Sequence, residues 1–117
     1  MTIDKRALDK LASLVGDDGE VLAEIVGSFL EEGPSLFDDL VDANRSSDLT
    51  RIRRAAHSIK SNARDMGAVD LAEICARIEE ASAAGNPPEA SNISQAHAEL
   101  QSAIAELSAI FKIGVRN

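Results

Sequence analysis

Apolar residues recur at intervals of three and four along most of the chain, and this spacing places them on one face of an α-helix. The pattern predicts a short helix over 4–15, a second from about 17 to a polar turn at 44–48, a third over about 48–66, a fourth over about 68–84 and a last over about 90–112. Amphipathic segments joined by short turns bury their apolar faces together as an antiparallel bundle. We therefore predict an all-α bundle with a short additional N-terminal helix, in one domain over residues 1–117.

Local signals mark where the predicted helices begin and end. Asp17 begins a capping-box pattern for the second helix. Ser47 or Asp48 is placed to cap the third helix, and Gly67 to end it, because glycine adopts the left-handed conformation without Cβ strain. The run G-N-P-P at 85–88 stops the fourth helix.

Pro34 lies inside the predicted second helix. Proline lacks the backbone N–H and disturbs the preceding turn, so it kinks or breaks a helix. The apolar spacing nevertheless continues in phase from Leu30 before the proline to Phe37 beyond it. We therefore expect one long, kinked helix rather than two helices.

Composition sets limits on the class of protein. Hydrophobic residues make up 44% of the chain, which is normal for a globular domain, and the formal net charge of −8 disfavours nucleic acid as a partner. No apolar run reaches the roughly 20 residues that span a bilayer, and the N-terminus lacks an apolar signal region. Cys75 is the only cysteine, which excludes an internal disulfide. We expect a cytoplasmic monomer that binds neither membrane nor nucleic acid.

The outer face of the third helix carries the main candidate for chemistry. At 100° per residue, His57 falls about 140° from the centre of the apolar stripe that includes Ile52 and Ile59, so its imidazole should face solvent. Residues 50–64 contain five basic residues and no carboxylate, which leaves 7 of the 12 basic residues and all 20 acidic residues elsewhere. An exposed imidazole therefore lies in a cationic stretch of an otherwise acidic protein.

Three motifs resemble those of histidine-containing phosphotransfer (HPt) domains. The first is A-H-S-I-K at 56–60, with Gly67 ten positions after the histidine. The second is L-A-E-I-C-A-R-I-E at 71–79, which looks like the family's L-x-x-x-C-x-x-L-E run. The third, S-F-L-E-E-G-P-S-L-F-D-D-L at 28–40, resembles the family's long second helix. The resemblance covers most of the chain and implies an antiparallel up-down four-helix bundle, with the phosphorylated histidine midway along one helix.

The resemblance implies roles for the residues on this helix. His57 is expected to accept a phosphoryl group through its distal ring nitrogen, which leaves the proximal nitrogen for a hydrogen bond or water. Lys60 is expected to stabilise the phosphoryl charge. We expect Arg53, Ser61 and Arg64 to bind the partner, and the nearby cations to favour the neutral imidazole.

The partners implied by the resemblance are receiver domains of response regulators and of a hybrid sensor histidine kinase. Such receivers bring an acidic pocket, the Mg²⁺ ion and the acceptor aspartate, so we expect no cofactor or metal bound by this chain itself. A cationic rim around His57 would steer that acidic pocket towards it. The sequence has no glycine-rich nucleotide-binding loop, so we expect a phosphocarrier without ATP-dependent kinase activity.

The sequence departs from the family pattern directly after the histidine motif. Ser61 stands where most members of the family carry glycine, and Asn62 and Ala63 replace residues that are commonly serine. The position of Ser61 requires a small residue so that a partner can approach. Because serine is small, we expect function to survive with somewhat altered docking.

Structural roles are expected for the other histidine and for the cysteine. His97 falls within the apolar stripe of the last helix, which predicts a buried or partly buried side chain. Cys75 also lies in a stripe and is most simply a small buried hydrophobe. One cysteine and two histidines on different helices do not give the spacing of a structural zinc site.

Two other functions stay open at this point. One is a helical adaptor that binds receiver domains without being phosphorylated, which Ser61 leaves open although His57 and Lys60 are intact. The other is the isolated phospho-acceptor domain of a chemotaxis-type histidine kinase. Met1 and the frayed-looking end G-V-R-N favour a complete protein over such a fragment.

Overall fold

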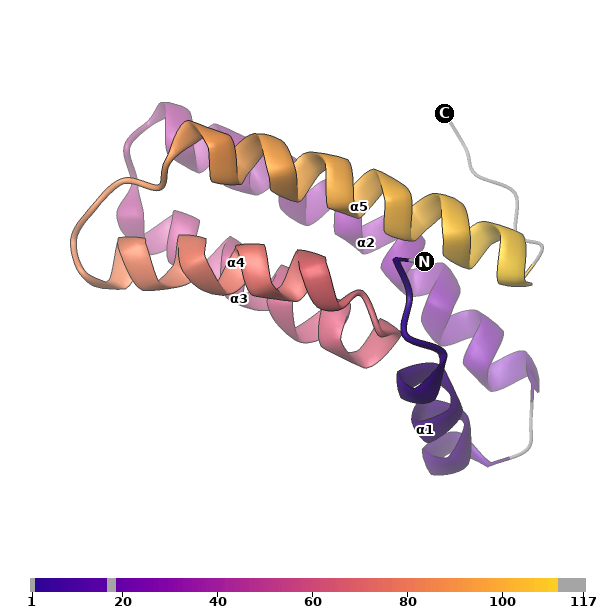
Figure 1. The fold of residues 1–117 in the computed structure, drawn as a ribbon. Helices are drawn as coiled ribbons and strands as arrows, with labels where there is room; N and C mark the ends of the chain where they lie inside the picture. The colour runs from indigo at the N-terminus through magenta and orange to yellow at the C-terminus, as the bar shows by residue number, and fades with distance from the viewer. Residues whose placement is uncertain (1, 17–18, 112–117) are drawn as a thin grey trace.

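The computed structural model describes residues 2–16 and 19–111, and its helices match the predicted segments closely. The helices are α1 (Lys5–Val15), α2 (Gly19–Arg45), α3 (Leu49–Met66), α4 (Val69–Ala83) and α5 (Ala90–Phe111). Helices α2 to α5 run alternately up and down and pack around one core, while α1 lies against one end of the bundle (Figure 1). This arrangement confirms the predicted all-α, antiparallel up-down four-helix bundle with an additional N-terminal helix.

The core is built from the apolar stripes. On α3 the residues Ile52, Ala56, Ile59, Ala63 and Met66 are all buried, as the spacing predicted. The most extensive packing joins α3 to α4 and α3 to α2, so α3 is held on two sides while its outer face stays exposed. The fold therefore presents this outer face on a rigid support.

Helix α2 is continuous through Pro34, which confirms one long helix. The side chain of Pro34 is exposed, whereas Gly33 is buried beneath α5. A Cβ atom at Gly33 would lie 3.1 Å from Cδ1 of Leu100, so the absence of a side chain lets α5 approach α2 closely.

The predicted ends of α3 are confirmed. Asp48 is the N-cap, and its side chain accepts a hydrogen bond of 3.2 Å from the backbone N–H of Arg51. Gly67 ends the helix in the left-handed conformation, at φ +80° and ψ 13°. The predicted capping role of Asp17 lies outside the described residues.

Residues 2–4 form an N-terminal clamp that ties two parts of the fold together. The backbone N–H of Asp4 donates to the carbonyl oxygen of Gly67 at 2.8 Å. The backbone N–H groups of Thr2 and Ile3 donate to Oε2 of Glu106 on α5, at 2.8 and 3.2 Å. The clamp thus joins the α3–α4 turn to α5.

The predicted burial of His97 is wrong. His97 is exposed, because Ala96 occupies the buried position on that turn of α5; its ring stacks on Phe37 at a centroid distance of 5.1 Å. On α4 Ser82 is buried near the C-terminal end of the helix, whereas its neighbour Ala81 is half-buried. The Ser82 hydroxyl donates to the backbone oxygens of Ile78 and Glu79, so its polar atom is satisfied.

Candidate functional site

His57 lies in the middle of α3 on the face turned away from the core. Its side chain is 61% exposed, which confirms that the imidazole faces solvent. The neighbouring Ala56 is completely buried, so the backbone at this position is fixed by the core while the ring stays accessible. The arrangement suits a side chain that must meet a partner molecule.

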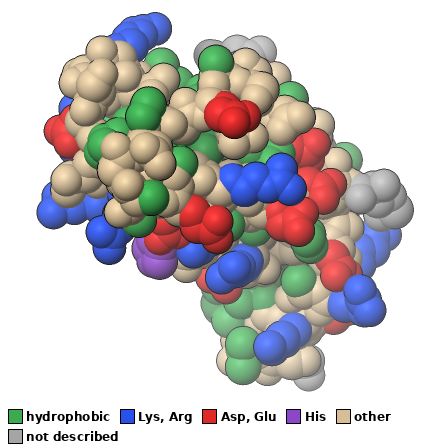
Figure 2. Space-filling view, turned by 60° about the vertical axis from the view of Figure 1, so that its left-hand side comes forward, with side chains coloured by type: hydrophobic (Ala, Val, Ile, Leu, Met, Phe, Trp, Pro, Cys, Tyr) green, Lys and Arg blue, Asp and Glu red, His purple; other side chains and the backbone are tan. Residues whose placement is uncertain are grey.

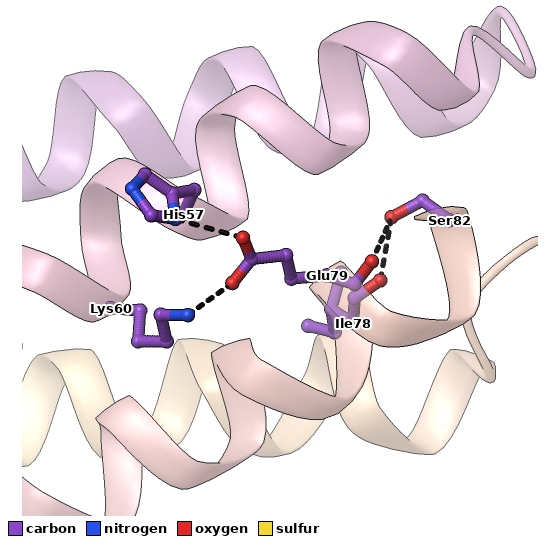
Figure 3. Close-up of polar contacts among 5 residues, drawn as sticks. All are labelled: His57, Lys60, Ile78, Glu79 and Ser82. Carbon is purple, nitrogen blue, oxygen red and sulfur yellow. Dashed lines mark hydrogen bonds and ion pairs between the residues drawn. The ribbon is translucent and has the colours of Figure 1, made fainter. Parts of the chain in front are cut away.

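A carboxylate from the adjacent helix contacts the imidazole. Oε2 of Glu79 on α4 lies 2.8 Å from Nδ1 of His57, and Oε1 of the same carboxylate is hydrogen-bonded to Nζ of Lys60 (Figure 3). Glu79 is 18% exposed and Lys60 is 16% exposed, so this ion pair lies at the edge of the α3–α4 contact. The three side chains form one hydrogen-bonded group.

The prediction of a cationic stretch around His57 left out a neighbouring carboxylate. It counted charges along one helix, and Glu79 reaches the ring from the helix that packs beside it. Figure 2 shows the same mixing on a larger scale, with basic and acidic side chains close together over the face drawn.

The pKa of Glu79 lies below its ordinary value of 4.5. Burial by itself would raise the pKa, but the hydrogen bonds from Lys60 and His57 stabilise the charged form and outweigh burial. The Glu79 carboxylate is therefore ionised at neutral pH and acts only as an acceptor.

An acceptor at Nδ1 determines the tautomer of the neutral imidazole. The proton must lie on Nδ1, so that it can be donated to Glu79, and Nε2 must carry the free lone pair. The predicted hydrogen bond at the proximal nitrogen is thus present, and the distal nitrogen is the one left available as a nucleophile.

The structure joins Lys60 to His57 through Glu79, and it places Arg53 in the same surface hollow as His57. Arg53 lines a surface hollow of about 540 Å³ that also contains Thr50, Arg54, His57, Ser58 and Glu79. Ser61 and Arg64 are exposed on later turns of α3 and do not line this hollow.

Sequence reasoning missed Glu79 and Arg54 as members of this site. A signal for Glu79 was present, because it is the last residue of the motif at 71–79. Its contact with His57 depends on how α4 is rotated against α3, which periodicity along one helix does not determine. Arg54 was counted among the cations, but only the structure places it in the hollow with His57.

No cluster of three or more metal-ligating side chains occurs within residues 2–16 and 19–111. None of the described helices is both long enough and apolar enough to cross a bilayer. The described residues around His57 supply one imidazole, one carboxylate, several cations and two hydroxyl groups, with an open face towards solvent.

Comparison with known proteins gives two matches. The family model of the Hpt domain matches residues 24–110. The crystal structure of histidine-containing phosphotransfer protein B (HptB) from Pseudomonas aeruginosa PAO1 is similar, with a TM-score of 0.85, 25% sequence identity and coverage of 95% of each chain. No curated protein sequence matches the chain significantly. The matched region contains α3, α4 and the whole hydrogen-bonded group around His57.

Proposed function

The chain belongs to the Hpt domain family and is a histidine phosphotransfer intermediate in phosphorelay signalling, and we propose that His57 is the residue that carries the phosphoryl group. Hpt proteins are phosphocarriers rather than kinases. In this proposal, His57 accepts the group from an aspartate of one receiver domain and passes it to an aspartate of another.

The observation that supports this role is the hydrogen bond between Nδ1 of His57 and Glu79. It orients the ring and leaves the lone pair of Nε2 facing away from the carboxylate (Figure 3). An exposed nucleophile on a rigid helix matches the needs of in-line transfer from a partner, in which positioning and charge compensation supply most of the catalysis.

Transfer to His57 exchanges one bond to phosphorus for another. The lone pair of Nε2 forms a bond to phosphorus, while the bond between phosphorus and the aspartyl oxygen of the receiver breaks and that carboxylate leaves with the electron pair. The ring gains positive charge as the new bond forms. Glu79, which accepts the Nδ1 proton in a hydrogen bond, stabilises that charge.

Lys60 keeps its proposed role in charge stabilisation, in a modified form. Its ammonium group is bonded to the Glu79 carboxylate, so it offsets a negative charge that would otherwise repel the incoming phosphoryl group. Glu79 and Lys60 act as positioning residues, because both affect the reaction through the His57 ring and its surroundings.

The partners proposed for this surface are receiver domains of response regulators and of a hybrid sensor histidine kinase. Arg53, Ser61 and Arg64 lie exposed on α3 at different distances from His57, where a docked receiver would meet them. The proposal includes Mg²⁺ bound by the receiver, no cofactor of the chain's own, a monomeric state and a cytoplasmic location.

The test is phosphotransfer from a phosphorylated receiver domain in the presence of Mg²⁺. We expect an acid-labile, base-stable label on the wild-type protein and none on His57→Gln. An equal label on both proteins would assign the phosphoryl group to another residue. A complete lack of label with several receivers, each of which binds the protein, would favour the adaptor function.

A further inference from the structure

We propose that Arg53 and Arg54 bind the phosphoryl group while it is attached to His57. This inference rests on the proposed function and deepens it, because it assigns the residues that hold the transferred group. Both arginines line the same hollow as His57.

The position of the two arginines on α3 brings them beside the ring. Arg53 and Arg54 precede His57 by four and three residues, and side chains at these spacings are neighbours on a helix surface, with Cβ atoms about 5–6 Å apart. Helical side chains also lean towards the N-terminus of their helix, so the His57 ring lies over the turn that carries the arginines.

The other cations near His57 either form ion pairs with carboxylates or lie outside the hollow. Lys60 is bonded to Glu79, and Arg51 forms an ion pair of 3.1 Å with Asp42 on α2. Arg64 lies two turns beyond His57 and does not line the hollow. Within the described part of the chain, Arg53 and Arg54 form no ion pair within 4.0 Å.

The balance of charge favours such a pair. A phosphoryl group carries a charge of about −1.5 to −2 at neutral pH. The charges of Lys60 and Glu79 cancel each other, so this ion pair supplies no net positive charge to the group. Two guanidinium groups supply the missing positive charges, and their planar donors suit phosphoryl oxygens.

The hollow is also large enough for this purpose. Its volume of about 540 Å³ exceeds the needs of one phosphoryl group, and Thr50 and Ser58 add hydroxyl groups to its lining. The remaining space leaves room for the part of a donor that carries the phosphoryl group. The arginines therefore form one side of a site that is open to a partner.

A donor without any protein tests this assignment directly. Phosphoramidate is a small molecule in which the phosphoryl group is bound to ammonia; Nε2 attacks phosphorus, the original P–N bond breaks, and ammonia leaves with the electron pair. We compare the wild type with Arg53→Gln, Arg54→Gln and the double variant. Arg77→Gln is the matched control, because Arg77 is exposed on α4 and lines a different hollow with Asp70 and Glu99.

We expect each single variant to phosphorylate roughly three- to tenfold more slowly than the wild type, and the double variant more slowly still. Arg77→Gln should retain the wild-type rate. Lysine in place of both arginines should restore part of the rate, because it keeps the charge but loses the planar donors.

Failure of the arginine assignment can be distinguished from failure of the proposed function. A wild-type rate for the double variant with phosphoramidate would overturn the assignment. A defect seen with a receiver but not with phosphoramidate would overturn it as well, since the arginines would then recognise only the partner. If the wild type itself acquires no label on His57 from either donor, the proposed function fails first.

Discussion

The Oε2 atom of Glu79 lies 2.8 Å from Nδ1 of His57, and this contact joins a residue of α4 to the exposed ring on α3. It determines which ring nitrogen is free, and it ties the ring to the ion pair that Glu79 forms with Lys60. The geometry at the His57 ring therefore depends on the packing of two helices and not on the histidine motif alone.

Replacement of Glu79 by glutamine should slow phosphotransfer to His57 by roughly 10- to 100-fold, which corresponds to the loss of one hydrogen bond to a charged group. The glutamine oxygen would turn towards the Lys60 ammonium, and its NH₂ group would then face Nδ1. That arrangement favours the tautomer in which Nε2 carries the proton. Nε2 then has no free lone pair with which to attack phosphorus. Single-turnover phosphotransfer measures the rate.

Glu80→Gln is the matched control for that substitution, because Glu80 is the exposed neighbour on α4. It should leave the rate unchanged. An equal rate for Glu79→Gln and the wild type would show that the hydrogen bond does not orient the ring. NMR of the imidazole nitrogens provides a second readout, with a change of tautomer expected only in Glu79→Gln.

The stability that Glu79 contributes should depend on pH. Because its pKa in the folded state is below the ordinary 4.5, its contribution is fully present above about pH 4.5 and is lost as the pH falls through the lower folded-state value. The difference in free energy of unfolding between the wild type and Glu79→Gln should therefore shrink on acidification from pH 7 to pH 3. Urea denaturation at several pH values measures it, and a constant difference would contradict the argument.

Alanine at Gly67 should destabilise the fold by about 3 kcal/mol, from backbone strain together with overpacking. The residue has φ +80°, and a Cβ atom there would overlap the carbonyl oxygen of Asp4. Gly85→Ala is the control: Gly85 has φ +85°, but nothing lies within 4 Å of its Cβ position. It should cost only about 1 kcal/mol, for strain alone. Equal losses in urea denaturation would show that the contact with Asp4 is unimportant.

A bulky residue at Ser61 should impair docking of a receiver but leave the chemistry of His57 intact. Ser61 is exposed on the turn after His57 and does not line the hollow. Ser61→Phe is therefore expected to weaken transfer from a phosphorylated receiver by at least about tenfold, through steric exclusion of the partner. Its rate with phosphoramidate should stay at the wild-type value. A loss with both donors would place Ser61 in the phosphoryl site itself.

Cys75 should resist thiol reagents in the folded protein. Burial, together with the nearby Glu79 carboxylate, raises the pKa of its thiol to about 12, although Lys60 opposes the shift. Very little thiolate is therefore present at pH 8. Mass spectrometry after iodoacetamide treatment should show labelling only in denaturant. Rapid labelling of the native protein would reveal frequent opening of the α3–α4 contact.

Most of the fold was predictable because it depends on patterns within single helices. The stripe through Ile52 and Ile59, the cap at Asp48 and the termination at Gly67 all follow from local spacing and backbone preference. The continuity of α2 through Pro34 followed from the phase of the apolar residues on both sides.

The site was predictable only in part, because contacts between helices depend on their rotation and separation. The motif and the helical wheel identified His57 and Lys60, but not the carboxylate between them. The predicted burial of His97 was wrong for a related reason. An apolar stripe has two edges, and only the packing of α5 on its neighbours decided that Ala96 points inwards and His97 does not.

The N-terminal clamp has a consequence for the synthesis of the protein. The hydrogen bonds from Thr2 and Ile3 to Glu106 span 104 and 103 positions of the chain. A ribosome produces the first residues long before Glu106, so these N–H groups remain without that acceptor until nearly all the described chain has been translated. The bundle can be completed only after residue 106 has been translated, and a nascent chain that stops before that residue lacks this closure.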